Sequence, residues 1–225
     1  MKSIIITGAG SGLGKELALL FSQQGYHLIL TGRTIEKLAA TKTAIEASGG
    51  KADIFPIDIQ DAAQVGEKVE EMSKTYQIVG LINNAGVGHF GPFVEIKDRQ
   101  ITEMLTTNVL GTILMTKAIL PQFLENHEGR IMNIISTAGL RGKVNESVYV
   151  ASKFAIRGFT ESLQKEFENS RIKITAVYMG GMDTPFWAGS DHVEDTSRFR
   201  SPREVAETII EQMDQDSIII ESKKS

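Results

Sequence analysis

A tyrosine and a lysine stand four residues apart within the segment SVYVASKFAI, which spans residues 147–156. In an α-helix, residues at this spacing lie on the same face, one turn apart. The phenol of Tyr149 could give or take a proton in a reaction if its pKa were lowered from about 10, the value in free tyrosine. An ammonium group at Lys153 would favour the phenolate and lower that pKa. The alternative is a core aromatic residue beside a solvated charge, so the rest of the chain has to decide between the two interpretations.

The composition of the 225-residue chain narrows the classes of protein to which it can belong. With 41% hydrophobic and 23% charged residues, it is typical of a soluble globular protein. The net charge of −4 gives no basic footprint for nucleic acid or for an anionic membrane surface. The chain has no cysteine, which excludes thiolate nucleophiles, disulfides and cysteine-based metal sites. Its four histidines are scattered along the sequence, so we expect no metal site.

The N-terminus and the apolar runs argue against a secreted or membrane-spanning protein. Met1 and Lys2 lead directly into the first apolar segment, which leaves no room for a signal peptide. No apolar run approaches the roughly 20 residues that a membrane span needs. We therefore expect a cytoplasmic protein that binds neither membranes nor nucleic acid.

Short β-branched apolar runs alternate with amphipathic segments along the whole chain. The expected strands are 3–7, 27–31, 51–58, 78–86, 130–136, 173–180 and 217–221. The expected helices are 12–25, 34–50, 61–76, 98–126 with a bend near Pro121, 149–169 and 202–214. This alternation predicts an α/β fold, a doubly wound, Rossmann-like parallel sheet of about seven strands with helices on both faces. We expect one domain over residues 1–225, with a polar, lid-like segment at about 184–201. Ligands of such sheets bind at the carboxyl ends of the strands, so the residues that follow each strand matter most.

A glycine-rich turn, TGAGSGLG at residues 7–14, follows the first expected strand. It is not a P-loop, because Ala9 and Glu16 occupy positions where that motif needs Gly and Ser or Thr. Between a strand and a helix, its glycines would let the backbone approach a pyrophosphate, and the helix N-terminus would favour the anion. The turn therefore predicts dinucleotide binding, with a plain tight turn as the alternative. The expected cofactor contacts are Gly8, Ser11, Gly12, Leu13 and Gly14.

The ends of the second and third strands are expected to recognise the adenosine half of that dinucleotide. The second strand ends in TGRT and offers no carboxylate for the ribose hydroxyls, whereas Arg33 suits a 2′-phosphate. This favours NADP(H), although Arg33 could be a surface residue and NAD(H) stays an alternative. After the third strand, Asp58 could accept from the adenine amino group while Ile59 packs against the ring.

The fourth strand ends in NNAGVG, an unusual sequence for an ordinary loop. Its small residues would let a ligand lie flat against the backbone, with contacts from Asn84, Ala85 and Gly86. The side chains of Asn83 and Asn84 could in addition lock neighbouring strands together.

Ser136 ends the fifth strand, in NIISTAG, and Tyr149 and Lys153 follow it in order. At this point the chain resembles a short-chain dehydrogenase/reductase of the compact, single-domain type. The resemblance covers nearly the whole length. The matching positions are Thr7, Gly8, Gly12, Gly14, Asp58, Asn83, Asn84, Ala85, Gly86, Asn108, Ser136, Tyr149, Lys153 and Thr184.

This resemblance implies hydride transfer between nicotinamide C4 and a carbonyl carbon. Tyr149 would be the general acid/base and would contact the cofactor, and Lys153 would bind the nicotinamide ribose. Ser136 would orient the substrate oxygen. Asn108 would hold a water molecule that links the lysine to solvent, and a structural Asn bonded to the backbone is the less favoured alternative.

The sequence departs from the family pattern in two places. After the sixth strand, Met179 replaces the usual proline, while Gly180 and Thr184 are kept. Cofactor contacts are expected from Thr184 and from the backbone near Met182, at the carboxamide. The chain also stops soon after the last strand, which weakens any inference of tetramer packing at that edge. We expect a homodimer through the two long helices, or a homotetramer.

The substrate pocket is expected to be partly apolar and without a charged clamp. Its candidate residues are Val87, His89, Leu140, Val144 and Phe186. Phe186 and Trp187 would either line this pocket or dock the lid-like segment.

The sequence therefore favours an NADP(H)-dependent oxidoreductase that acts on a small carbonyl or alcohol substrate. The alternative from another class is a dinucleotide-binding regulatory protein without turnover. The complete set of Asn108, Ser136, Tyr149 and Lys153 argues against it, because binding alone does not need all four. A sugar-nucleotide epimerase or dehydratase usually needs a substrate domain, for which this chain has little spare length.

Overall fold

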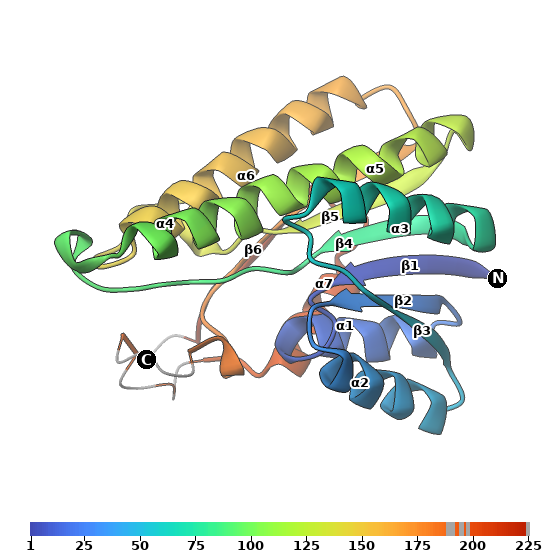
Figure 1. Cartoon of the computed structure of the whole chain (residues 1–225), viewed down its shortest axis with the longest axis horizontal. Coiled ribbons are helices and arrows are strands. Elements are labelled where there is room, and N and C mark those ends of the chain that lie inside the picture. Colours follow the sequence, from blue (N-terminus) through green and yellow to red (C-terminus); the bar gives the residue numbers. More distant parts are fainter. Residues whose placement is uncertain (188–191, 194–195, 197–198, 224–225) are drawn as a thin grey trace.

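The computed structural model describes residues 1–187, 192–193, 196 and 199–223. In this part of the chain one sheet has seven strands in the order β3-β2-β1-β4-β5-β6-β7, and every neighbouring pair is parallel (Figure 1). The strands are β1 Lys2–Thr7, β2 His27–Gly32, β3 Lys51–Pro56, β4 Gln77–Asn83, β5 Gly129–Ile134, β6 Ile172–Met179 and β7 Ser217–Ile220. The predicted α/β fold with about seven parallel strands is confirmed.

Helices cover both faces of the sheet, as predicted. They are α1 Gly12–Gln23, α2 Ile35–Ala47, α3 Ala62–Thr75, α4 Asp98–Met104, α5 Thr112–Glu125, α6 Ser147–Glu166 and α7 Pro202–Glu211. In Figure 1, α3, α4, α5 and α6 lie above the sheet, and α1, α2 and α7 lie below it. The strands are apolar on both sides for this reason: Ile4 and Ile6 of β1 join one core cluster, and Ile5 joins the other.

Polar side chains tie the ends of the central strands together inside this core. The Nδ2 atom of Asn83 donates to Oδ1 of Asn133 on β5 at 2.9 Å, and Nδ2 of Asn133 donates to the hydroxyl of Thr160 on α6 at 2.9 Å. The Nδ2 atom of Asn84 donates to the carbonyl of Thr7 on β1 at 2.9 Å. The predicted locking role of the two asparagines is confirmed, and it fixes β1, β4, β5 and α6 relative to one another.

The long helix predicted over 98–126 contains a change of geometry, but its position differs from the prediction. Residues Leu105–Gly111 form a π-helical segment between α4 and α5, whereas α5 continues through Pro121. The irregular turn therefore lies at Asn108, where the side chain bonds to a loop outside the helix. Helix α6 begins at Ser147, two residues earlier than predicted.

The run 98–125 is also the one helix, within the described ranges, whose length and apolar composition would permit a membrane crossing. Ile119 and Phe123 are fully buried and join the core cluster beneath the helix. We therefore regard it as a core helix of a soluble domain.

Candidate active site

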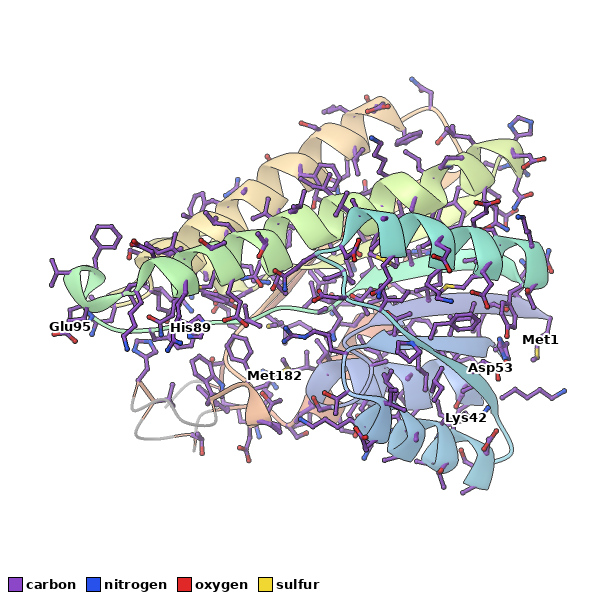
Figure 2. The ribbon with its side chains drawn as sticks, viewed as in Figure 1. Met1, Lys42, Asp53, His89, Glu95 and Met182 are labelled. Carbon is purple, nitrogen blue, oxygen red and sulfur yellow. The ribbon has the colours of Figure 1, made fainter. Side chains whose placement is uncertain are left out.

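A cleft of about 710 Å³ follows the carboxyl ends of the strands. Its walls come from the turn after β1, the ends of β2, β3 and β4, the start of α6 and the segment after β6. Figure 2 labels two of its lining residues, His89 in the segment beneath α4 and Met182 in the segment after β6. All predicted catalytic and cofactor-binding residues line this cleft except Gly14 and Asn108.

The glycine-rich turn has the shape that a pyrophosphate needs. Gly12 has a φ of +52°, and a side chain there would lie 3.3 Å from Thr184. Ser11, the N-cap residue of α1, makes no side-chain capping bond, so its hydroxyl does not block the N–H groups of the first turn. Gly14 lies behind the turn: a Cβ there would be 2.4 Å from the carbonyl oxygen of Gly8. Packing therefore requires a glycine at this position, and the predicted cofactor contact of Gly14 stays a prediction, while the rest of the turn fits a dinucleotide.

The adenosine end of the cleft carries positive charge and has no carboxylate from β2. The exposed side chain of Arg33 lines it, and among the described residues Arg33 forms no ion pair. Lys37, one turn into α2, lines the same region and was not predicted as a site residue. Its position four residues after Arg33 was the available signal. Asp58 uses Oδ1 to accept from the amide of Gln60 at 3.1 Å.

Ile59 lines the cleft and is buried against the long helix. A Cβ at Gly111 would lie only 2.6 Å from side-chain atoms of Ile59. The packing of Ile59 therefore requires a glycine at position 111. The π-helical segment thus supports Ile59, the residue that would face an adenine ring.

Ser136, Tyr149 and Lys153 meet at the end of β5, and each is only 6% exposed. The Ser136 hydroxyl is close enough to the phenol of Tyr149 to lower its pKa. The Nζ atom of Lys153 donates to the carbonyl oxygen of Ile134 at 3.1 Å and lies 5.6 Å from the centroid of the Tyr149 ring. The structure thus brings together three of the four predicted catalytic residues.

Ser136 has a backbone conformation that non-glycine residues rarely adopt, with φ +99° and ψ 151°. Such a conformation costs on the order of 1–3 kcal/mol and persists where surrounding contacts enforce it. Here the Ser136 amide donates to the carbonyl of Val177 at 3.4 Å, and its hydroxyl accepts from the amide of Ala138 at 3.2 Å. These contacts hold Ser136 in its strained conformation, a feature that the sequence pattern does not reveal.

Burial dominates the acid–base properties of the centre. It raises the pKa of Tyr149 above its usual value, a hydrogen bond with Ser136 opposes that rise, and the negative charge of Glu146 adds to it. Burial lowers the pKa of Lys153 to about 8. In the protein alone the pKa of Tyr149 is therefore raised, and Lys153 is not among the groups that shift it, so the lowering expected from the ammonium group stays a prediction.

Asn108 is 2% exposed and does not line the cleft. Its Oδ1 accepts from the amide of Val87 at 2.8 Å, and its Nδ2 donates to the Val87 carbonyl at 2.9 Å and to the Ser152 hydroxyl at 3.0 Å. The less favoured alternative, an asparagine bonded to backbone, therefore describes this side chain. Asn108 positions the loop after β4 against α6, and its link to a water molecule stays a prediction.

The substrate end of the cleft is partly apolar, as predicted, but its lining differs. Val87, His89 and Phe186 line it, whereas Leu140 and Val144 do not. Val144 is 83% exposed because its loop turns it toward solvent. Phe186 and Trp187 fulfil both suggested roles: they line the cleft, and the indole of Trp187 donates to the Met182 carbonyl at 3.0 Å. Parts of the predicted lid-like segment, 188–191, 194–195 and 197–198, lie outside the described residues.

A buried carboxylate lies in the pocket that was expected to have no charged clamp. Glu146 is 6% exposed and lines the cleft one helical turn before Tyr149. Its Oε1 lies 3.1 Å from Nε2 of His192, and its Oε2 lies 3.8 Å from Nζ of Lys143. An acidic residue three positions before the candidate tyrosine was the signal in the sequence. In the described ranges, no group of three acidic or histidine side chains is arranged to hold a metal ion.

Known proteins with the same sequence pattern and fold support this description. Residues 2–195 match the family model described as short chain dehydrogenase. The chain is 31% identical over 216 residues to a sepiapterin reductase from Chlorobaculum tepidum, covering 92% of this chain and 88% of the relative. It is 31% identical over 218 residues to the 3-oxoacyl-[acyl-carrier-protein] reductase FabG from Thermotoga maritima, covering 93% and 89%.

Among solved structures, a short-chain dehydrogenase from Sphingobium yanoikuyae in complex with NADPH superimposes with a TM-score of 0.90 at 25% identity. That match covers 98% of this chain and 87% of the other. Family model, relatives and fold agree over nearly the full length. The chain belongs to the short-chain dehydrogenase family of oxidoreductases.

Proposed function

We propose that this protein is an NADP(H)-dependent oxidoreductase that interconverts a carbonyl and an alcohol. One observation carries the proposal: the buried phenol of Tyr149 lies with Ser136 and Lys153 at one end of a cleft whose other end is the glycine-rich turn. A protein that only binds dinucleotides does not need a buried proton donor beside the cofactor cleft.

The residues of the centre suit the reduction of a carbonyl group. When bound, a nicotinamide would supply the hydride. Ser136 would hold the substrate oxygen by its hydroxyl, and Tyr149 would donate its proton to that oxygen as negative charge develops there. Because burial raises the pKa of Tyr149, the phenol stays protonated near neutral pH and remains ready to donate. Lys153 would stabilise the resulting phenolate by its positive charge.

Preference for NADP(H) over NAD(H) is supported by the charges at the adenosine end. Arg33 and Lys37 both line the cleft there, and β2 ends without a carboxylate that would repel a 2′-phosphate. The similar structure from Sphingobium yanoikuyae was solved with NADPH. NAD(H) is the alternative for the same chemistry.

A screen of NADPH oxidation against ketones, aldehydes, diketones and acyl thioesters tests this proposal. Sepiapterin and a 3-oxoacyl thioester are included because of the names of the two relatives. We expect turnover with at least one class, abolished by Tyr149→Phe. Tight NADPH binding without turnover of any class would instead favour the second candidate, a regulatory protein that only binds dinucleotides.

We further propose a homodimer formed through the long helices. Leu105 and Leu110 of the π-helical segment and Phe154 of α6 are apolar and more than 40% exposed on the outer face of the molecule. Light scattering on the purified chain would give the mass, and a monomer at micromolar concentration would contradict the proposal. A cytoplasmic location remains a prediction from the sequence.

A further inference from the structure

We propose that Glu146 and the aromatic rings beside it select a substrate that carries a positive charge near its carbonyl group. This inference rests on the proposed function and adds a substrate class to it: short or cyclic amino ketones, or the corresponding amino alcohols.

The burial of Glu146 is not explained by the needs of the helix that it precedes. It is the N-cap residue of α6, yet its side chain makes no capping bond. Burying a carboxylate is costly unless it is paired, and its partners among the described residues are the imidazole of His192 at 3.1 Å and the ammonium of Lys143 at 3.8 Å, which is too far for a hydrogen bond. The carboxylate is close enough to Tyr149 for its charge to raise the pKa of the phenol. A second cation in this place would therefore interact with both the carboxylate and the reaction centre.

Aromatic rings gather beside the same part of the cleft: Tyr149, Phe186 and Trp187 line it, and Phe90 packs against all three without lining it. The ring of Phe90 lies 5.4 Å from that of Tyr149 and 5.1 Å from that of Trp187, measured between centroids. Phe186 is 5.9 Å from both Phe90 and Tyr149. A buried carboxylate beside several ring faces is the combination that binds ammonium groups, through charge and through cation–π attraction.

A side chain of the protein itself already uses this combination. The imidazole of His192 is stacked on Phe90 at 4.8 Å, with an angle of 16° between the rings, and is 6.3 Å from Trp187. Its Nε2 is 3.1 Å from Oε1 of Glu146. His192 thus occupies the place that we assign to a substrate amine, which would displace the imidazole and take over its contact with Glu146.

A second carboxylate–histidine pair in the cleft provides an internal control. His89 Nε2 lies 2.9 Å from Glu103 Oε2, and both residues line the cleft. This pair is more exposed, with 39% of the Glu103 side chain accessible, and neither residue has a ring contact among the described residues. The same Glu→Gln substitution can therefore be made inside and outside the aromatic site.

The test compares two ketones of the same shape that differ in charge. N-methyl-4-piperidone is protonated on nitrogen near neutral pH, and 4-methylcyclohexanone is its neutral counterpart. We expect wild-type kcat/KM with NADPH to favour the amine at least tenfold. Glu146→Gln should abolish this preference, mainly by raising the KM for the amine, whereas Glu103→Gln should keep it. Equal kcat/KM for the two ketones in the wild type would overturn the inference without the need for any variant.

A binding measurement separates this inference from the proposed function. Trp187 is the only tryptophan in the chain, and it forms part of the aromatic site, so its fluorescence reports occupancy directly. If neither ketone is reduced, the proposed function loses support, but N-methylpiperidine should still change the fluorescence of the wild type and not that of Glu146→Gln. No response in the wild type, or an equal response in both proteins, would overturn the cation site.

Discussion

A tyrosine lies among ionisable groups at each end of the sheet, and the two tyrosines differ in their surroundings. At the amino end, the hydroxyl of Tyr76 donates to Asp53 Oδ2 at 2.9 Å, and the ring stacks on His27 at 4.9 Å. Asp53 also contacts Nε2 of His27 at 3.1 Å and Nζ of Lys42 at 3.2 Å. Figure 2 labels Asp53 and Lys42 at this end, remote from His89 and Met182 at the other. This network, formed by His27, Lys42, Asp53 and Tyr76, fastens the edge strand β3 to its neighbours.

At the carboxyl end, the hydroxyl of Ser136 lies near the phenol of Tyr149, and among the described residues no carboxylate accepts a hydrogen bond from Tyr149. Burial and the hydrogen bond to Asp53 raise the pKa of Tyr76 to about 12, and burial raises that of Tyr149 as well. The pKa alone therefore does not distinguish the two tyrosines. What differs is that Tyr76 donates to a fixed carboxylate outside the cleft, whereas Tyr149 faces a cleft in which a substrate oxygen can become its acceptor.

The largest expected effect separates the two phenols by activity. Tyr149→Phe should lower kcat by about 100- to 10,000-fold, the usual contribution of general acid–base catalysis, and leave NADPH binding nearly intact. Tyr76→Phe should keep kcat within about twofold and lower the free energy of unfolding by about 1 kcal/mol, the typical value of one hydrogen bond. Steady-state kinetics and urea unfolding measure both. A Tyr149→Phe variant with more than about a tenth of wild-type kcat, chemistry being rate-limiting, would break the comparison.

The next effect compares Arg33, which forms no ion pair among the described residues, with Lys42, which does. A charge-assisted hydrogen bond contributes roughly 1.5–3 kcal/mol, and the exposure of Arg33 places it at the lower end. Arg33→Ala should therefore lower kcat/KM for NADPH about tenfold and barely change that for NADH. Lys42→Met, which removes a cation already bonded to Asp53 and Glu46, should affect stability and neither cofactor. Equal losses for NADPH and NADH in Arg33→Ala would mean that Arg33 supports the fold or stacks on adenine.

The pH dependence of stability probes the paired network at the amino end. Burial lowers the pKa of His27 despite the neighbouring Asp53, so the folded protein holds this imidazole neutral. A group whose pKa is lowered by folding adds stability above its unfolded pKa, about 6.5 for histidine, and loses it as the pH falls below that value. We expect the wild type to lose stability between about pH 6.5 and pH 5, and His27→Gln to lose less. Parallel pH profiles for the two proteins would show that His27 does not titrate in this way.

The smallest effect concerns backbone strain at Ser136. Both Ser136→Ala and Ser136→Gly remove the hydroxyl, but only glycine adopts φ +99° without strain. The free energy of unfolding of the glycine variant should therefore be about 1 kcal/mol higher than that of the alanine variant, although both variants lose activity. Chemical denaturation of the two variants is sufficient, and an alanine variant as stable as the glycine variant would argue against stored strain.

The sequence predicts much of the reaction centre because its residues follow from local rules. Tyr149 and Lys153 are placed by helical spacing, and Ser136 and Asn84 by their positions at strand ends, which meet at one edge of a parallel sheet. The glycine-rich turn was recognisable because it lies between a strand and a helix.

The features that were missed or misjudged depend on contacts between distant segments. Asn108 bonds to Val87, 21 residues away, and His192 reaches Glu146 from 46 residues away. The upward shift in the pKa of Tyr149 follows from desolvation, which depends on everything packed around the ring. Val144 was predicted in the pocket from its apolar character, but the direction of its loop decides its exposure.

The most direct test of the central claim, that Tyr149 exchanges the proton, is the pH dependence of single turnovers in both directions. Reduction needs the neutral phenol and oxidation needs the phenolate, and burial keeps the phenol neutral. We predict a rate of reduction that is constant from about pH 6 to pH 8 and a rate of oxidation that rises with pH over the same range. Deuterated NADPH would establish that hydride transfer is being measured. Equal slopes in the two directions, or the same opposite slopes in Tyr149→Phe, would contradict the assignment of Tyr149 as the proton donor.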